Sequence, residues 1–131
     1  MTTVLDSFAL LAFLRAEPGF ETVPQVIADA PMRGDELLMT AVNVGEAFYL
    51  TERRRGKARL PALEKALEEL PMDIVDADLE LAKRTAALKA HKKMSYADCF
   101  AADLVSLRGA RLVTGDKKFK QVEADIETLW I

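Results

Sequence analysis

The sequence lacks the residues that build many catalytic and metal centres. Cys99 is the only cysteine and His91 the only histidine among 131 residues. A single cysteine excludes an intrachain disulfide and a cysteine cluster for zinc or iron–sulfur. A single histidine excludes a multi-histidine metal centre. A Ser-His-Asp triad would have to use His91, which lies in the basic run Lys89–Lys93 and is interpreted as part of a solvated helix end.

Four other features are absent. Neither a Walker pattern nor a GxGxxG motif occurs, so no glycine-rich loop is available to hold a phosphate. No basic and apolar leader precedes a cleavage site, and no apolar run is long enough to span a bilayer, so we expect a reduced cytoplasmic protein without membrane contact. Basic residues are not in excess, because 18 Lys and Arg stand against 21 Asp and Glu, for a net charge of −3.

The composition is that of an ordinary globular chain, with 50% hydrophobic and 30% charged residues. We expect a single domain over residues 1–131. Short apolar runs alternate with helical patterns along the chain. The expected strands are Thr2–Leu5, a segment within Glu36–Val42, Met72–Val75, Arg111–Thr114 and Glu127–Ile131. This alternation predicts a three-layer α/β/α sandwich around a central, mostly parallel sheet of four to five strands.

The expected helices differ in how clearly the sequence marks them. The clearest begins after Ser95 as N-cap and stops at Gly109. The others are Ser7–Arg15, Phe20–Ala30 with an end near Pro31, a helix with Val44, Ala47, Phe48 and Thr51 on one face, a helix marked by Leu60, Leu63, Leu67 and Leu70, and Ala77–His91, which is expected to be the longest.

Four acidic residues follow strands or open helices in this scheme. Asp6 ends the first strand, Glu46 lies in the first turn after the second strand, Asp116 follows the fourth strand and Asp98 lies in the first turn after Ser95. Ligands of open α/β sheets bind beyond the carboxyl ends of the strands. Each acid also has a structural interpretation, as a helix cap, part of a capping box or a turn residue.

Taken together, the four acids favour a functional interpretation. Carboxylates that converge repel one another by about 1–4 kcal/mol per close pair, and helix dipoles offset only part of that repulsion. A site of carboxylates without histidine or cysteine suits a hard cation, Mg²⁺ or Mn²⁺. Such ions activate water and stabilise the leaving oxygen when a phosphodiester is hydrolysed.

Four segments carry a resemblance to a known family. Val4–Leu11, Asn43–Ala47, Tyr96–Ala102 and Leu112–Phe119 together resemble a PIN domain, and the length resembles the VapC toxins of toxin–antitoxin pairs. The resemblance implies a metal-dependent endoribonuclease with Asp6, Glu46, Asp98 and Asp116 around Mg²⁺ or Mn²⁺. It also implies hydrogen-bond support from Ser7 and Thr114, a homodimer, and a VapB-like antitoxin that places an arginine among the carboxylates.

The charge balance is compatible with an RNA substrate. Without the four carboxylates the formal charge would be +1. Lys117 and Lys118 directly follow Asp116 and are candidates for contacts with RNA phosphates. The basic runs Arg53–Arg59 and Lys89–Lys93 are interpreted as solvated helix ends, and Tyr96 could stack on a base or pack against a neighbouring helix.

Two alternatives remain open. The first is a PIN-like binding module without catalysis, whose acidic rim receives a basic peptide. The second is phosphotransfer through an aspartyl phosphate at Asp6. Haloacid dehalogenase-type enzymes need a second aspartate two residues later, where this chain has Phe8, which disfavours the second alternative.

Overall fold

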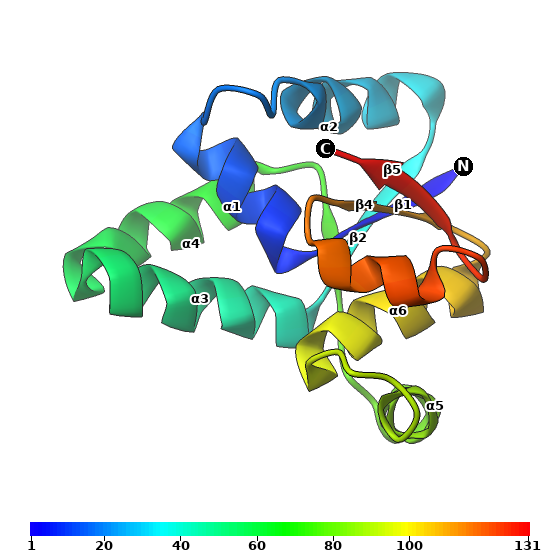
Figure 1. The fold of residues 1–131 in the computed structure, drawn as a ribbon. Coiled ribbons are helices and arrows are strands. Elements are labelled where there is room, and N and C mark those ends of the chain that lie inside the picture. Colours follow the sequence, from blue (N-terminus) through cyan, green and yellow to red (C-terminus); the bar gives the residue numbers. More distant parts are fainter.

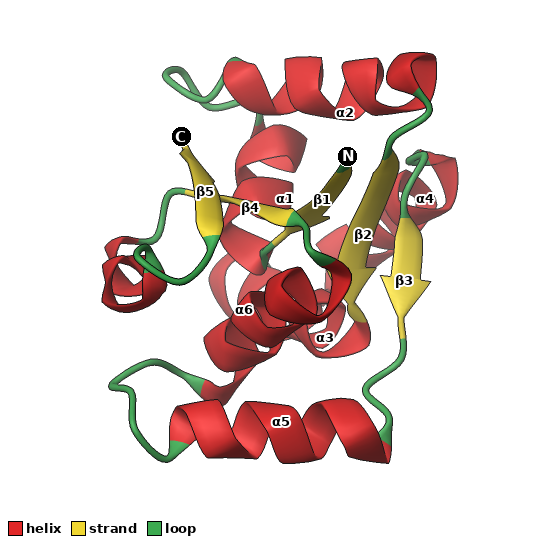
Figure 2. Ribbon diagram, turned by 90° about the vertical axis from the view of Figure 1, so that its right-hand side faces the viewer, coloured by secondary structure: helices red, strands yellow, loops and turns green.

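A parallel five-stranded sheet forms the centre of the molecule in the computed structural model, which describes residues 1–131 (Figure 2). Its strands are β1 (Thr2–Leu5), β2 (Glu36–Thr40), β3 (Asp73–Val75), β4 (Arg111–Thr114) and β5 (Glu127–Trp130). Their order is β3-β2-β1-β4-β5, and all neighbouring pairs are parallel. The expected sandwich with a mostly parallel sheet is therefore confirmed, and the sheet is parallel throughout.

Helices cover both faces of the sheet (Figure 1). They are α1 (Ser7–Arg15), α2 (Thr22–Arg33), α3 (Ala41–Arg55), α4 (Leu60–Glu69), α5 (Leu79–Lys89) and α6 (Tyr96–Arg108). Two 3₁₀ segments, Lys57–Arg59 and Lys117–Val122, complete the regular structure. None of the helices combines the length and the apolar character needed to cross a bilayer.

Side chains that alternate along the strands build a core on each face of the sheet. Val4, Leu38 and Leu112 belong to a cluster that contains the buried face of α6. Leu5 and Val113 point the other way and pack with residues of α2. Because successive strand residues face opposite sides, each of these strands is covered on both faces, as expected for a parallel sheet.

Two helix predictions need correction. The second helix does not end near Pro31 but runs to Arg33, because Pro31 lies in the last turn and the helix stops at Gly34, whose φ of 71° suits glycine. Ala77–His91 was expected to be the longest helix, but Asp78 caps it, so α5 has 11 residues whereas α3 has 15. Neither difference changes the sheet.

The strand order places a crevice at the carboxyl end of β1. From β1 the chain passes to β2 and β3 on one side of the sheet, and it later returns to β4 and β5 on the other. Val4 pairs in register with Leu38 of β2 and with Leu112 of β4. Such a reversal of strand order is where open α/β sheets bind ligands, and Asp6 is the first residue beyond it.

Candidate active site

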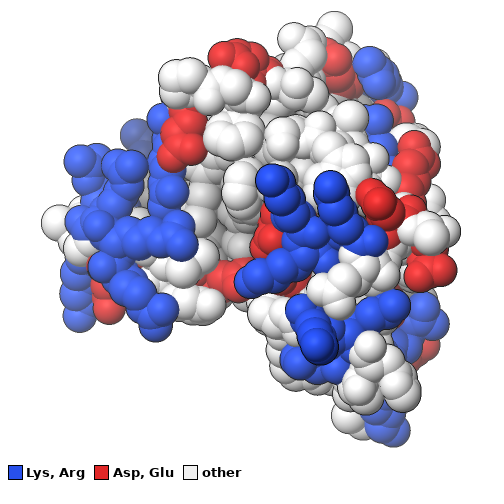
Figure 3. Space-filling view, viewed as in Figure 1, with Lys and Arg blue, Asp and Glu red and all other residues white.

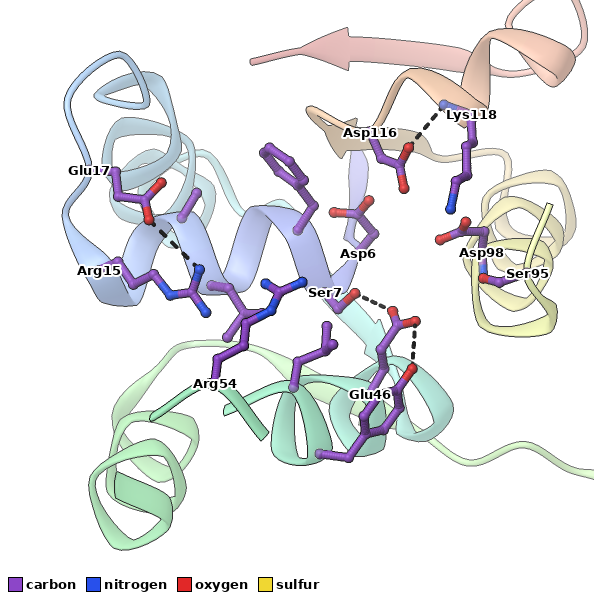
Figure 4. Close-up of a pocket in the computed structure, with 15 residues that line it drawn as sticks. Asp6, Ser7, Arg15, Glu17, Glu46, Arg54, Ser95, Asp98, Asp116 and Lys118 are labelled. Carbon is purple, nitrogen blue, oxygen red and sulfur yellow. Dashed lines mark hydrogen bonds and ion pairs between the residues drawn. The ribbon is translucent and has the colours of Figure 1, made fainter. Parts of the chain in front are cut away.

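All four acidic residues singled out from the sequence line one pocket, of about 370 Å³, at the carboxyl edge of the sheet. Asp6 follows β1, Glu46 lies on α3, Asp98 on α6 and Asp116 after β4. Figure 4 shows their carboxylates directed toward a common space. Segments distant in the sequence therefore assemble this pocket, as the sequence analysis predicted for the acidic group.

Asp6 is held at the floor of the pocket by a chain of hydrogen bonds. It is 1% exposed and caps α1, where its Oδ1 accepts from the backbone N–H of Ala9 at 2.8 Å. The Thr114 hydroxyl donates to Asp6 Oδ2 and accepts from the backbone N–H of Asp116 at 3.0 Å. The end of β4 thus fixes the orientation of Asp6 and the start of the Asp116 turn together.

The helix starts that carry Glu46 and Asp98 are joined to each other. The Thr40 hydroxyl at the end of β2 caps α3 by accepting from the backbone N–H of Asn43 at 3.0 Å. Asn43 is fully buried, and its Nδ2 donates to the carbonyl of Ala97 in α6 at 3.0 Å. Since Ala97 precedes Asp98, this bond sets the distance between the two acidic helices.

Glu46 and Asp98 each have a local partner. The Ser7 hydroxyl donates to Glu46 Oε1, so the first residue of α1 contacts the acid of α3. The Tyr49 hydroxyl lies 3.5 Å from Glu46 Oε2. Asp98 is 5% exposed, and its backbone N–H donates to the Ser95 hydroxyl at 3.1 Å, the N-cap predicted for this helix. Asp98 is therefore both part of the helix cap and part of the pocket wall.

Burial and mutual repulsion disfavour the charged form of the two deepest acids. Burial is the main cause that raises the pKa of Asp6 to about 7, and the nearby Asp98 and Asp116 add to it against the hydrogen bonds from Thr114 and Ala9. Burial also raises the pKa of Asp98 to about 6, with further contributions from Asp116 and Glu46. The hydrogen bond with Ser95 and, to a smaller extent, the ammonium of Lys118 lower the pKa of Asp98, but they do not offset these effects.

Basic residues also reach the pocket, and the sequence analysis identified only part of them. Lys118 lines the pocket as expected, whereas Lys117 does not. Arg54 and Arg15 line it too, although Arg54 belongs to a run interpreted as a solvated helix end. The missed signal was helical spacing, because Arg54 follows Glu46, and Arg15 follows Ser7, by eight residues along one helix face.

The donor set fits a hard divalent cation in its chemistry. It offers carboxylate and hydroxyl oxygens without sulfur or imidazole, which is the set that Mg²⁺ and Mn²⁺ prefer. Burial first, and then the neighbouring acids, raise the pKa values of Asp6 and Asp98, and a bound cation would favour the charged forms of both groups. As the side chains lie, no three acidic groups are close enough together to hold an ion. Binding would therefore require rotation of the more exposed side chains of Glu46 and Asp116.

The family of the chain follows from a direct comparison. The model of the PIN domain matches residues 3–125, a segment that includes all four acidic residues. The chain belongs to the PIN domain family. The PIN domain fold suggested by the four sequence segments is therefore confirmed. No curated protein matches the chain in sequence.

Several solved structures share the fold over nearly the whole chain. One is the sarcin-ricin loop-cleaving toxin VapC20 of Mycobacterium tuberculosis, with a TM-score of 0.77, 13% identity, and coverage of 98% of this chain and 99% of that chain. Another is in the promoter-bound VapBC2 of Rickettsia felis, with a TM-score of 0.75, 14% identity, and coverage of 100% and 99%. A third is in the DNA-bound VapBC of Salmonella typhimurium, with a TM-score of 0.74, 18% identity, and coverage of 98% and 97%.

Proposed function

We propose that this PIN domain is a metal-dependent endoribonuclease and the toxin of a toxin–antitoxin pair. The observation that carries the proposal is the pocket itself, where Asp6, Glu46, Asp98 and Asp116 from four separate segments face a common space. The similarity to VapC20, described as a sarcin-ricin loop-cleaving toxin, supports RNA as the substrate class.

The side chains of the pocket would have different roles in the reaction. A bound Mg²⁺ or Mn²⁺ supplies Lewis-acid stabilisation of the phosphate and promotes ionisation of the attacking water. The four carboxylates would hold the ion. Thr114 and Ser7 fix the orientation of Asp6 and Glu46 through their hydroxyl hydrogen bonds. The Lys118 ammonium, at the pocket wall, would contact an RNA phosphate.

A small VapB-like antitoxin is the proposed protein partner, and a homodimer is the proposed assembly. Two of the structures similar to this chain belong to VapBC complexes. The acidic pocket offers the charge that would attract a basic antitoxin side chain such as arginine. An antitoxin that occupies the pocket in this way would exclude both the metal and the RNA.

The proposal is tested by a pair of substitutions on α6. Asp98→Asn removes a carboxylate that lines the pocket, whereas Asp103→Asn removes one that does not. Cleavage of total RNA in Mg²⁺ or Mn²⁺ should fall at least about 100-fold for Asp98→Asn, the usual minimum for loss of a group that stabilises a transition state. Asp103→Asn should retain the rate of the unchanged chain.

Two results would contradict the nuclease. Intact protein that cleaves no RNA in either metal would do so, and so would cleavage that persists in EDTA. The binding-module alternative would then be tested with an arginine-rich peptide. Metal-independent binding of that peptide, lost in Asp98→Asn, would favour an acidic rim without chemistry.

A further inference from the structure

Two lysine-rich segments lie side by side next to the pocket. They are distant in the sequence, since the hydrogen bonds that join them connect residues 28 positions apart. One segment begins at Lys89, the last residue of α5, and continues into the loop after it, and the other is the 3₁₀ segment after Asp116. We call the combined surface the lysine ridge. It consists of Lys89, Lys92, Lys93, Lys117, Lys118 and Lys120. The first of the two segments was interpreted from the sequence as a solvated helix end.

Gln121 joins the two segments. Its side-chain Oε1 accepts from the backbone N–H of Lys93 at 3.0 Å, and its Nε2 donates to the carbonyl of Lys93 at 3.1 Å. The Lys92 ammonium donates to the carbonyl of Gln121 at 3.3 Å. Three hydrogen bonds therefore fix the spacing between the two rows of lysines, which an ordinary pair of solvated loops would leave free.

Apolar anchors hold the ridge on the core. Met94, directly after Lys93, is 2% exposed, and Phe119, between Lys118 and Lys120, is fully buried. Both belong to the same core cluster as the buried face of α6. With a buried residue inside each segment, the backbone is fixed while most of the lysine side chains extend into solvent. The ridge is thus pre-organised, which lowers the entropy cost of binding a ligand.

The charge on the ridge is of one sign and reaches the pocket. No aspartate or glutamate occurs in residues 89–97 or 117–122, and acidic residues border the ridge only at Asp98 and Asp116 on the pocket side and at Glu123 and Asp125 beyond it. Lys118 and Ser95, one from each segment, line the pocket. Figure 3, in the same view as Figure 1, shows blue Lys and Arg surface next to red Asp and Glu surface in the region of the 3₁₀ segment after Asp116.

We infer that the lysine ridge binds the phosphate backbone of the RNA strand that leads into the acidic pocket. This inference rests on the proposed function and names the surface that would hold the substrate. In a chain of negative net charge, positive charge gathered on one surface can still bind RNA, because phosphate contacts release counterions locally. The ridge supplies such a surface next to the site of cleavage.

The experiment measures RNA binding separately from cleavage. Binding of a fluorescein-labelled single-stranded RNA is followed by anisotropy in EDTA at salt concentrations from about 0.05 to 0.3 M, a range over which phosphate contacts weaken strongly. Two ridge variants are compared, Lys92→Ala with Lys93→Ala and Lys117→Ala with Lys120→Ala. The control, Arg33→Ala with Lys65→Ala, removes one cation from the last turn of α2 and one from the middle of α4, and neither residue lines the pocket.

Each ridge pair should weaken binding about 25-fold at 0.1 M salt. Each phosphate contact on a single strand contributes a slope of about 0.7 in log affinity against log salt, so losing two contacts lowers the slope by about 1.4. The control pair should leave both the affinity and the slope unchanged. RNA cleavage in Mg²⁺ is then measured with the same variants.

Each outcome is decisive for one of the two proposals. If the ridge pairs bind RNA as well as the control pair, the ridge inference is wrong while the nuclease proposal stands. If they bind RNA weakly but the intact chain cleaves none, the ridge is supported and the nuclease is not. If the ridge pairs lose affinity for an acidic peptide but not for RNA, the surface serves a protein partner and the inference is overturned.

Discussion

Acidic residues have opposite surroundings at the edge of the sheet where the strands end and at the edge where they begin. At the carboxyl edge, Asp6 and Asp98 are almost completely buried and no salt bridge reaches them. At the opposite edge, Asp35 accepts from the N-terminal ammonium at 2.6 Å, and Asp29 lies 3.5 Å from a guanidinium nitrogen of Arg33. A second, smaller cavity at that edge is lined by Asp29, Asp35, Arg33 and Arg111.

The pKa values follow this difference. The hydrogen bond from the N-terminal ammonium lowers the pKa of Asp35, whereas burial and neighbouring acids raise the pKa of Asp6 to about 7. Where the chain supplies its own cations, the acids form salt bridges with them. Where it buries acids together and no salt bridge reaches the deepest of them, a cation from outside would stabilise the site.

The largest expected effect on stability is the titration of Asp6. Its pKa is raised from 3.8 to about 7, so the folded protein binds more protons than the unfolded chain between those values. The free energy of unfolding of the metal-free protein should therefore fall as pH rises from about 4 to about 7, by up to about 4 kcal/mol from this group. Urea unfolding across this pH range measures it. Asp6→Asn should make the decline smaller, and the part that remains should come from Asp98, whose pKa is also raised, to about 6.

Asp35→Asn is the matched control at the opposite edge. Because the pKa of Asp35 is lowered, its contribution to stability is present above pH 3.8 and is lost as pH falls through the folded-state pKa. The variant should differ from the unchanged chain near neutral pH and approach it in acid. If Asp6→Asn and the unchanged chain instead show parallel curves from pH 4 to 7, the comparison between the edges is wrong.

Metal binding should change the free energy of unfolding by a smaller amount than the titration of Asp6, and this change should depend on the carboxyl edge alone. At a Mn²⁺ concentration 100 times Kd, the free energy of unfolding should rise by about 2.7 kcal/mol. Asp98→Asn should lose most of this gain, and Asp35→Asn should keep it. The gain should be larger at pH 7.5 than at pH 5.5, because protons compete with the metal for raised-pKa carboxylates. A stability unchanged by Mn²⁺ in the intact protein would exclude a metal site in the pocket.

Much of the carboxyl edge could be predicted from the sequence because its signals are local. Strand ends, the Ser95 cap and the Gly109 stop each depend on a few neighbouring residues, and β1, α1 and β4 have the predicted bounds. The grouping of Asp6 and Asp116 then follows from parallel strands alone, since the carboxyl ends of β1 and β4 meet at one edge.

Long-range contacts could not be predicted in the same way. Nothing in the local sequence shows that the Asn43 side chain reaches Ala97, or that Gln121 joins the lysines of two distant segments. The error at Pro31 has a similar origin, because a proline in the last turn of a helix removes one hydrogen bond without ending the helix. These features depend on tertiary packing rather than on propensity.

Gly115 offers a test of how tightly the carboxyl edge is packed. A Cβ at this position would overlap the ring of Phe8, whose Cζ would lie 2.8 Å away. Phe8 lines the pocket and packs edge-on against Phe20, with 5.6 Å between the ring centroids. Gly115→Ala should therefore reduce stability by about 1–3 kcal/mol through overpacking. It should also slow RNA cleavage, because the displaced ring would alter the pocket. Unchanged thermal unfolding and cleavage would show that this edge can relax.

Gly34, at the opposite edge, should give the smallest effect and one confined to stability. It ends α2 with a φ of 71° and has open space around the position of a Cβ. Gly34→Ala should reduce the free energy of unfolding by about 1 kcal/mol, the cost of a left-handed alanine, and Gly34→Asn by less. Single-turnover RNA cleavage should be unchanged in both variants at a temperature where they are folded. A slower rate would mean that the two edges are coupled through the sheet, and the contrast between them would then hold for charge but not for packing.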